Sequence, residues 1–247
     1  MPPDDLIPDD LTPDSSNPDS PNPDDQPPND ITRLEQALRN RALNIRKAAL
    51  DELAKLPADV AVPVLKRLAA EPDFLLRRLA VMGLGNHRVP AAFEVLEALL
   101  HQEKDSNVLA EAANSLFEFG GPAIPLLTRL FETHPHWLIR QTILSLLLET
   151  TEYGTLLTLA TTGLDDETRA VKETAILALR HVLASDYQGE ALALLSDLAQ
   201  SDMWRDRWRA ATALTGCQAP QARQLVQQLQ KDENYRVSAA ALDAAMP

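Results

Sequence analysis

Residues 73–85 read DFLLRRLAVMGLG, and within them Arg77, Ala80 and Leu84 form the pattern basic-x-x-Ala-x-x-x-Leu. The pattern recurs at intervals of 29 to 35 residues, with a few substituted positions and a last copy that loses register. The other copies begin at Arg46, Leu109, Arg140, Lys172, Arg207 and Arg236. Self-similarity at this period is typical of stacked, near-identical supersecondary units. It therefore predicts a solenoid, a class of protein that generally works through a long surface.

Each unit contains two helical patterns. The first is rich in leucine at spacings of three and four, as in residues 93–100, and the second carries the basic-x-x-Ala motif. Apolar side chains at such spacings form one buried stripe along a helix. Val and Ile are mixed with Ala and Leu at helical spacing and never alternate as they do in strands. We therefore predict an all-α superhelix of about seven helical hairpins over residues 31–247.

Glycine, proline and aspartate mark the ends of these helices. Glycine adopts the left-handed conformation that closes a helix, and we expect several glycines to end second helices. They are Gly85, Gly120, Gly121, Gly154, Gly189 and Gly216. An Asp ahead of a motif can accept hydrogen bonds from the free amides of the second helix. The residues in this position are Asp73, Asp105, Asp166, Asp202 and Asp232.

The unit at residues 73–85 is followed by NHRVPAAFEVLEAL, residues 86–99, and the break recurs as Gly120-Gly121-Pro122. This order of Asp, Leu-Arg, Ala-rich helix, Leu-Gly break and Pro-led Leu-rich helix resembles HEAT repeats, specifically the phycobilisome-lyase-type HEAT-like repeat. The resemblance covers about seven units, from residue 33 to 245. It implies a right-handed alpha-alpha superhelix of the HEAT/armadillo kind. Family members include bilin lyase subunits, phycobilisome-degradation factors and scaffolds.

Residues 1–30 differ from the rest of the chain, since they hold nine Asp, nine Pro and no Lys or Arg. The whole chain carries a net charge of −13, so the remainder carries only −4 and lacks the basic footprint of a nucleic-acid-binding protein. Such a segment buries too little apolar area to offset its chain entropy, and we expect a disordered acidic tail. Two kinds of role are open: a solubilising leader, or an acidic tail that either binds a partner or inhibits the protein by folding back across the inner face.

The cellular location follows from what the sequence lacks. Cys217 is the single cysteine, so no intrachain disulfide can form. The N-terminus has neither the basic nor the apolar region of a secretory signal. No apolar run approaches the length that crosses a bilayer. We expect a cytoplasmic protein with no integral membrane segment.

Residues 203–209 read MWRDRWR and are the densest concentration of aromatic and basic side chains. Trp204 and Trp208 are four residues apart and share a helix face. Because Trp and Arg are enriched in interface hot spots, we predict a partner-binding patch at Arg205, Trp208 and Arg209. In the alternative interpretation, both tryptophans fill the core and the arginines are solvated.

The basic residues of the repeated motif also form a row, which has two interpretations. Each cation can pair with an Asp or with carbonyls of an adjacent unit, which makes a ladder inside the stack. The row can instead be a basic stripe on the inner face, suited to an elongated acidic partner. With the second helix of each unit supplying the contacts, Arg78 and Arg140 are the next partner-binding residues that we predict after Arg205, Trp208 and Arg209.

Motifs for catalysis are missing, because the sequence contains no dinucleotide-binding glycine fingerprint, P-loop or nucleophile elbow. His134 and His136 lie two residues apart, which puts them on different helix faces, and we expect a loop there and no metal site. Cys217 has no close cationic partner that would activate it, and we expect a structural or incidental role. We therefore predict no catalytic residues and no bound metal.

The sequence predicts a non-catalytic scaffold or adaptor that binds a protein partner on its concave face and needs no cofactor. The alternative, which the family resemblance implies, is a phycocyanobilin lyase or another chromophore-handling subunit of the phycobilisome. On that alternative the cofactor is a bilin tetrapyrrole, held by the aromatic and basic side chains of residues 204–209. The expected partner is an acidic protein or a phycobiliprotein, and nucleic acid is not expected.

Overall fold

The computed structural model describes residues 30–245, which form fourteen α-helices, one short 3₁₀ helix and no strand. The helices are α1 (Asp30–Leu38), α2 (Leu43–Leu53), α3 (Ala58–Leu68), α4 (Phe74–Gly85), α5 (Pro90–Gln102), α6 (Ser106–Phe117), η2 (Gly121–Ala123), α7 (Ile124–Thr133), α8 (Trp137–Leu147), α9 (Tyr153–Leu164), α10 (Arg169–Val182), α11 (Gln188–Ala199), α12 (Trp204–Ala213), α13 (Pro220–Leu229) and α14 (Tyr235–Ala245). The all-α prediction is confirmed. The tail predicted for residues 1–30 lies outside the described residues, except for Asp30, the first residue of α1.

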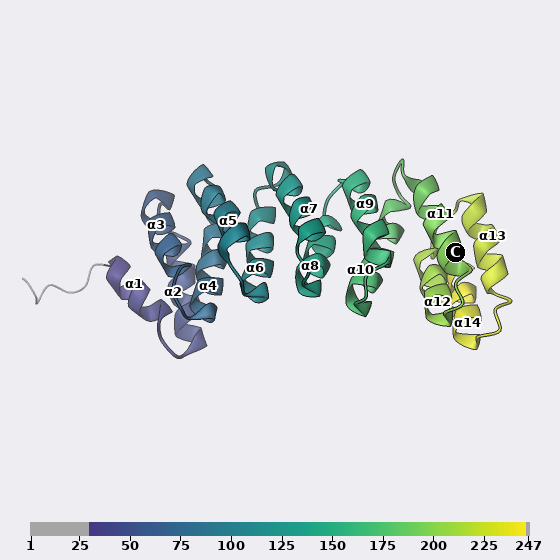
Figure 1. Ribbon diagram of the computed structural model, residues 1–247, viewed down its shortest axis with the longest axis horizontal. Helices are drawn as coiled ribbons and strands as arrows, with labels where there is room; N and C mark the ends of the chain where they lie inside the picture. Colours follow the sequence, from purple (N-terminus) through teal and green to yellow (C-terminus); the bar gives the residue numbers. More distant parts are fainter. Residues whose placement is uncertain (1–29, 246–247) are drawn as a thin grey trace, which may run out of the picture.

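Consecutive helices form seven hairpins, from α1–α2 to α13–α14, and the hairpins stack side by side in one elongated row (Figure 1). Each hairpin contacts its neighbours along the row, as expected for a solenoid. The prediction of about seven stacked helical hairpins is confirmed over the described residues.

The repeated motif supplies the contacts between neighbouring hairpins. Its second position is buried in six copies, at Ala49, Ala80, Ala112, Ile143, Ala175 and Ala210. Its third position is buried in the same six copies, at Leu53, Leu84, Leu116, Leu147, Leu179 and Leu214. None of these side chains is more than 2% exposed. Burial of one leucine contributes about 1.5–3 kcal/mol, so the motif accounts for much of the core.

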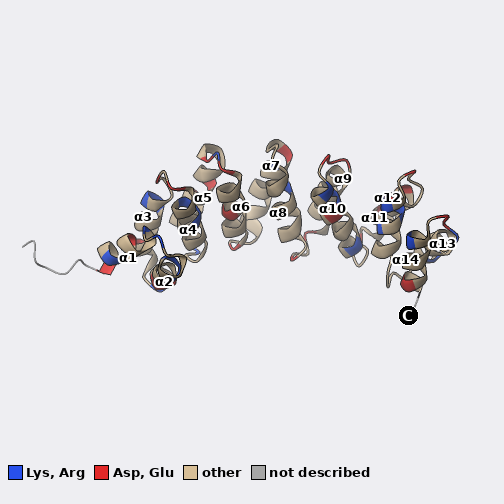
Figure 2. Ribbon diagram, turned by 90° about the horizontal axis from the view of Figure 1, so that it is seen from below, with Lys and Arg blue, Asp and Glu red and all other residues tan. Residues whose placement is uncertain are grey.

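The stack has two layers. The odd-numbered helices α5, α7 and α9 lie on the outer side of the arch, and α6, α8 and α10 lie on the inner side (Figure 2). Neighbouring even-numbered helices contact one another more extensively than neighbouring odd-numbered helices do. The small motif residues of the even-numbered helices allow this close approach, and the leucine-rich outer helices remain further apart. This difference accounts for the curvature of the row.

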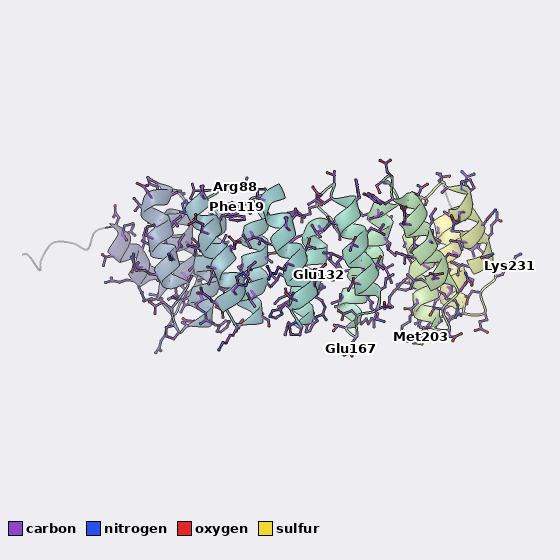
Figure 3. All side chains as sticks on the ribbon, turned by 45° about the horizontal axis from the view of Figure 1, so that its top comes forward. Arg88, Phe119, Glu132, Glu167, Met203 and Lys231 are labelled. Atoms are coloured by element: carbon purple, nitrogen blue, oxygen red, sulfur yellow. The ribbon has the colours of Figure 1, made fainter. Side chains whose placement is uncertain are left out.

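The even-numbered helices run parallel to one another. Glu167 and Met203, which precede α10 and α12, lie at one edge of the row, whereas Arg88 and Phe119, which follow α4 and α6, lie at the opposite edge (Figure 3). The amino-terminal turns of the motif helices are therefore neighbours along a single edge.

Two glycines close helices as predicted. Gly120 follows α6 with a φ of 70°, and Gly216 follows α12 with a φ of 81°. The prediction is wrong for Gly154 and Gly189, which lie in the first turns of α9 and α11. A Cβ on Gly154 would lie 2.8 Å from the hydroxyl oxygen of Tyr187, so this glycine admits a side chain of the next unit.

The aspartates ahead of the motifs divide into two groups. Asp73 and Asp105 each accept backbone N–H groups two and three residues further on, which confirms the predicted caps of α4 and α6. Asp166 and Asp232 each accept only one such amide. At Asp202 the prediction is wrong, because the neighbouring Ser201 hydroxyl accepts the Met203 amide instead.

Candidate partner-binding surface

The first residue of the motif forms a ladder along the edge where the even-numbered helices begin. Arg77 donates from Nε to Glu103 of the next unit at 2.7 Å. Its Nη1 donates to the carbonyl oxygens of Glu71 and Pro72 at 3.0 and 2.9 Å. Equivalent ion pairs join Arg46 to Asp73, Arg140 to Asp166 and Arg207 to Asp232. At these four positions the motif cation pairs with a carboxylate of the next unit, so the structure shows a ladder of ion pairs inside the stack.

Three of the four pairs are largely buried on both sides, whereas in the Arg46–Asp73 pair the side chain of Asp73 is 45% exposed. Asp166 has a side chain only 6% exposed and accepts from Arg140 at 2.6 Å. Burial, the largest single influence, acts to raise the pKa of Asp166, but the hydrogen bonds from Arg140 and from Thr168 and the charge of Arg140 together lower the pKa below its usual value. At Asp232 the hydrogen bond from Arg207 is the main cause of a lowered pKa. Arg140, which we predicted as a partner contact, is engaged inside the stack.

Arg78, another predicted contact, points to the neighbouring inner helix. Its Nε donates to Glu111 of α6 at 2.9 Å, and Glu111 is buried. Beside this pair the two helices are in close contact, because Ser115 packs against Gly85 and donates to the carbonyl oxygen of Val81 at 2.9 Å. The inner face is therefore closed between α4 and α6.

Helix α12 carries the predicted tryptophan and arginine patch, and the structure separates its members. Trp208 is 38% exposed, Arg205 is exposed and Trp204 is half-buried. Arg209 is only 8% exposed and donates to Glu173 at 2.9 Å and to Asp206 at 3.0 Å. The alternative prediction, in which both tryptophans fill the core and the arginines are solvated, is wrong for Trp208 and for Arg209. Arg205 and Trp208 are available to a partner, whereas Arg209 joins α12 to α10.

Two hollows in the inner face meet at Trp208. A hollow of about 290 Å³ between α10 and α12 is lined in part by Ile176, Leu177, Arg180, Trp208, Arg209 and Thr212. A hollow of about 530 Å³ between α12 and α14 is lined in part by Trp204, Arg205, Trp208, Tyr235, Arg236 and Asp243. We refer to these two hollows together as the Trp208 surface.

The Trp208 surface has an excess of positive charge. Hydrogen bonds from Arg169 and then Arg209 keep the pKa of Glu173 below its usual value, so this carboxylate is ionised and already paired. Three further arginines that line the hollows form no ion pair within residues 30–245: Arg180, Arg205 and Arg236. Asp243 is the one lining carboxylate in the described residues without an ion pair. Free guanidinium groups therefore outnumber free carboxylates.

Aromatic rings hold two of these arginines in place. The guanidinium of Arg205 lies 4.7 Å from the ring centre of Trp204, and that of Arg236 lies 5.4 Å from the same centre. Arg236 also donates to the Tyr235 hydroxyl at 3.0 Å. Cation–π contacts of this kind contribute roughly 0.5–1 kcal/mol at exposed sites. They place positive charge beside Trp208, and the adjoining α10–α12 hollow adds the apolar side chains of Ile176 and Leu177, an arrangement that suits an acidic chain with apolar side chains.

The middle of the inner face is polar. A hollow of about 310 Å³ between α6 and α8 is lined by Asn114, Gln141, Thr142 and Ser145, among others. The side chains of Asn114 and Gln141 form no hydrogen bond within the part of the chain that the structure describes. Amide groups can donate and accept at once, so they can bind the backbone of an extended segment.

Sequence reasoning missed several members of the Trp208 surface, among them Leu177, Arg180, Tyr235 and Arg236. The first two lie five and eight residues after Lys172, on the exposed side of a motif helix. The other two open the copy of the motif that loses register. A comparison of exposed motif positions along the even-numbered helices could have found them.

The other predicted features have simple surroundings. His134 and His136 lie in the turn between α7 and α8, as expected. No three His, Cys, Asp or Glu side chains within residues 30–245 gather as metal ligands would. Cys217 is a partly buried free thiol after α12. None of the helices in that range combines the length and apolarity of a membrane span.

Comparison with known proteins agrees with this architecture. Residues 63–147, which reach from α3 to α8, match the sequence model of the HEAT repeats family. The hairpins within this range accordingly resemble HEAT repeats, and the hairpins on either side continue the same stack. No curated protein matches the chain.

Solved structures show the same fold. The YibA protein of Escherichia coli has a TM-score of 0.62 at 14% identity, over 86% of this chain and 81% of that chain. The karyopherin Kap121p, bound to the extreme C-terminus of the protein phosphatase Cdc14p, has a TM-score of 0.53 at 18% identity, over 87% of this chain and 29% of that chain. The CpcE–CpcF complex of phycocyanin lyase from a Nostoc species has a TM-score of 0.46 at 17% identity, over 90% and 97%. At that TM-score the last likeness says nothing further about this chain.

Proposed function

We propose that the protein is a non-catalytic scaffold that binds a partner protein on its inner face, with the Trp208 surface as the main contact. The observation that carries this proposal is the meeting of two open hollows at a half-exposed tryptophan, beside three arginines that form no ion pair with any residue from 30 to 245. HEAT solenoids generally bind proteins through such extended surfaces.

The chemistry of the surface indicates what the partner offers. Tryptophan and arginine are the side chains that most often dominate interface energetics. Leu177, which is 54% exposed, adds apolar area next to Trp208. The partner is therefore an acidic segment with apolar side chains.

Site-specific photo-crosslinking tests the proposal. A photoreactive phenylalanine analogue placed at position 208 should capture a partner in cells, whereas the same analogue at Trp137, exposed on α8, should not. The double variant Arg205→Ala/Trp208→Ala should lose binding of the captured protein by at least about tenfold, as hot-spot residues do. Arg209 stays unchanged in this test, because its removal would leave Glu173 without a partner inside the fold.

The control is the pair Trp137→Ala/Arg223→Ala, which removes the same side-chain types elsewhere. Both double variants should unfold at nearly the wild-type temperature. Equal capture at positions 208 and 137, or equal binding by the two double variants, would exclude the Trp208 surface as the partner site.

A bilin chromophore is the second candidate ligand, with a phycobiliprotein as the partner that receives it. The aromatic rings of Trp204, Trp208 and Tyr235 beside Arg205 and Arg236 support it, because a tetrapyrrole needs apolar contact and cations for its propionates. Phycocyanobilin added to the purified protein should then change its absorbance spectrum. An unchanged spectrum would favour the scaffold alone. A cytoplasmic location remains a prediction.

A further inference from the structure

The chain contains a segment with the chemistry that the Trp208 surface fits. Residues 4–11 read DDLIPDDL, two pairs of carboxylates around three aliphatic side chains. We propose that residues 4–11 bind to the Trp208 surface of the same molecule and compete there with the partner. This inference rests on the proposed function of that surface.

The aliphatic side chains single out this part of the N-terminal segment. Within residues 1–29 the side chains of Leu6, Ile7 and Leu11 are the only branched aliphatic ones. The Pro-Asp units from residue 13 onward repeat the charge without them. A surface that recognised charge alone would bind residues 4–11 and the later Pro-Asp units equally well. A surface with an apolar floor favours residues 4–11, because only they carry branched aliphatic side chains.

The surface offers a complement to each type of side chain. Ile176 and Leu177 provide the apolar floor of the α10–α12 hollow, and Trp208 separates it from the α12–α14 hollow. Among the described residues the arginines at positions 180, 205 and 236 have no ion-pair partner, so their guanidinium groups can bind the carboxylates of the segment. The closed inner face between α4 and α6 offers no equivalent, since Arg78 is already paired with Glu111.

The connecting chain is long enough. Six steps between packed helices, from α1 to α2 and then along the inner helices to α12, span about 48–60 Å at 8–10 Å each. Residues 12–29 link the segment to Asp30, and a proline-rich chain of that length extends about 55–60 Å at 3.1 Å per residue. The segment can therefore reach the far end of the inner face along the row.

Weak intrinsic binding is sufficient for such a contact. A tethered segment is present at an effective concentration in the millimolar range. A millimolar dissociation constant is therefore enough for the segment to be bound in about half of the molecules. Charge pairs at an exposed surface contribute to this binding, and salt screens them. The segment should therefore bind more weakly as the ionic strength rises.

The test uses the full-length protein and the indole N–H resonances of its three tryptophans. The variant Leu6→Ser/Ile7→Ser/Leu11→Ser and the variant Asp4→Asn/Asp5→Asn/Asp9→Asn/Asp10→Asn should each shift the resonances of Trp204 and Trp208. Trp137, on α8, should stay at its wild-type position. The matched control Asp14→Asn/Asp19→Asn/Asp24→Asn/Asp25→Asn removes four charges outside the segment and should leave all three resonances in place.

Two results would overturn the inference. One is an unchanged Trp208 resonance in the first two variants, and the other is an equal shift in the control. A Trp208 shift that disappears in the wild type on twentyfold dilution would assign the contact to a second copy, which also contradicts binding within one molecule.

Photo-crosslinking separates this inference from the proposed function. The Leu6→Ser/Ile7→Ser/Leu11→Ser variant should raise capture of the partner at position 208 by about twofold or more. This is the increase expected if the segment occupies the surface in half of the wild-type molecules and the variant frees it. Capture at position 208 without any effect of the tail variants would end the inference and leave the scaffold function standing. Indole shifts without any capture would support tail binding and exclude the partner function.

Discussion

The α4–α6 contact and the α10–α12 contact are built from the same parts and have opposite outcomes. In both, an arginine of one inner helix pairs with a glutamate of its neighbour: Arg78 with Glu111, and Arg209 with Glu173. Between α4 and α6 the helices touch along their length, whereas between α10 and α12 they leave a hollow of about 290 Å³.

The size of the other side chains accounts for the difference. Gly85 and Ser115 lie between α4 and α6, and a Cβ on Gly85 would already lie 3.0 Å from the Cα of Ser115. At the equivalent repeat positions of α10 and α12 stand Arg180 and Ala213, and the much larger Arg180 lines the hollow together with the exposed Leu177 and Trp208. One motif therefore serves both for closure of the stack and for an opening in it, depending on the residues around it.

The largest expected effect comes from one substitution made in both regions. Leu116→Ala on α6 removes a fully buried side chain and should lower the free energy of unfolding by about 2–5 kcal/mol. Leu177→Ala on α10 removes an exposed one and should change it by no more than about 0.5 kcal/mol. Urea unfolding of both variants measures the difference, and similar losses would contradict the contrast between a closed and an open contact.

A smaller effect is expected where glycine permits the close contact. Gly85→Ala should destabilise the protein by about 1–3 kcal/mol, because the new Cβ meets the backbone of Ser115. The control is Gly189→Ala on α11, where no atom lies within 4 Å, and its stability should stay equal or rise by up to about 1 kcal/mol. Thermal unfolding distinguishes the two, and a Gly85→Ala protein as stable as the control would show that α4 and α6 have room to separate.

The smallest expected effect concerns pH and His87, which is buried just after α4. Burial lowers the pKa of His87, and a hydrogen bond to the backbone of Leu53 opposes this only in part. The folded state thus favours the neutral ring, whereas the unfolded chain takes up a proton near pH 6.5. Stability is present above that pH and is lost as the pH falls below it, by at most about 1.4 kcal/mol per pH unit.

The measurement is the unfolding temperature of wild type and His87→Gln between pH 7.5 and 5.0. The wild type should lose more stability than the variant over this range. His134, whose pKa burial also lowers, is present in both proteins and cancels in the comparison. Parallel curves for the two proteins would show that His87 is not protonated on unfolding.

Several features could be predicted from the sequence because they depend on local patterns. The caps at Asp73 and Asp105 follow from helix termini that lack partners for their first amides. The left-handed Gly120 and Gly216 follow from the steric freedom of glycine. The patch around Trp208 was located because tryptophan and arginine are concentrated there. Arg209 was misplaced within it, since nothing nearby in the sequence shows that Glu173, 36 residues away, pairs with it.

The sequence by itself determined the repeat, the paired helices and the order of the stack, because a buried stripe at helical spacing and a regular period leave one way to bury the apolar faces. Tertiary structure decided which motif cations are paired inside the stack and which inner contacts are open. The pairing of the cations and the opening of the contacts both depend on the distance between neighbouring inner helices, such as α4 and α6, which are separated in the chain by one outer helix. That distance is set by the combined size of side chains from both helices, and neither helix specifies it alone.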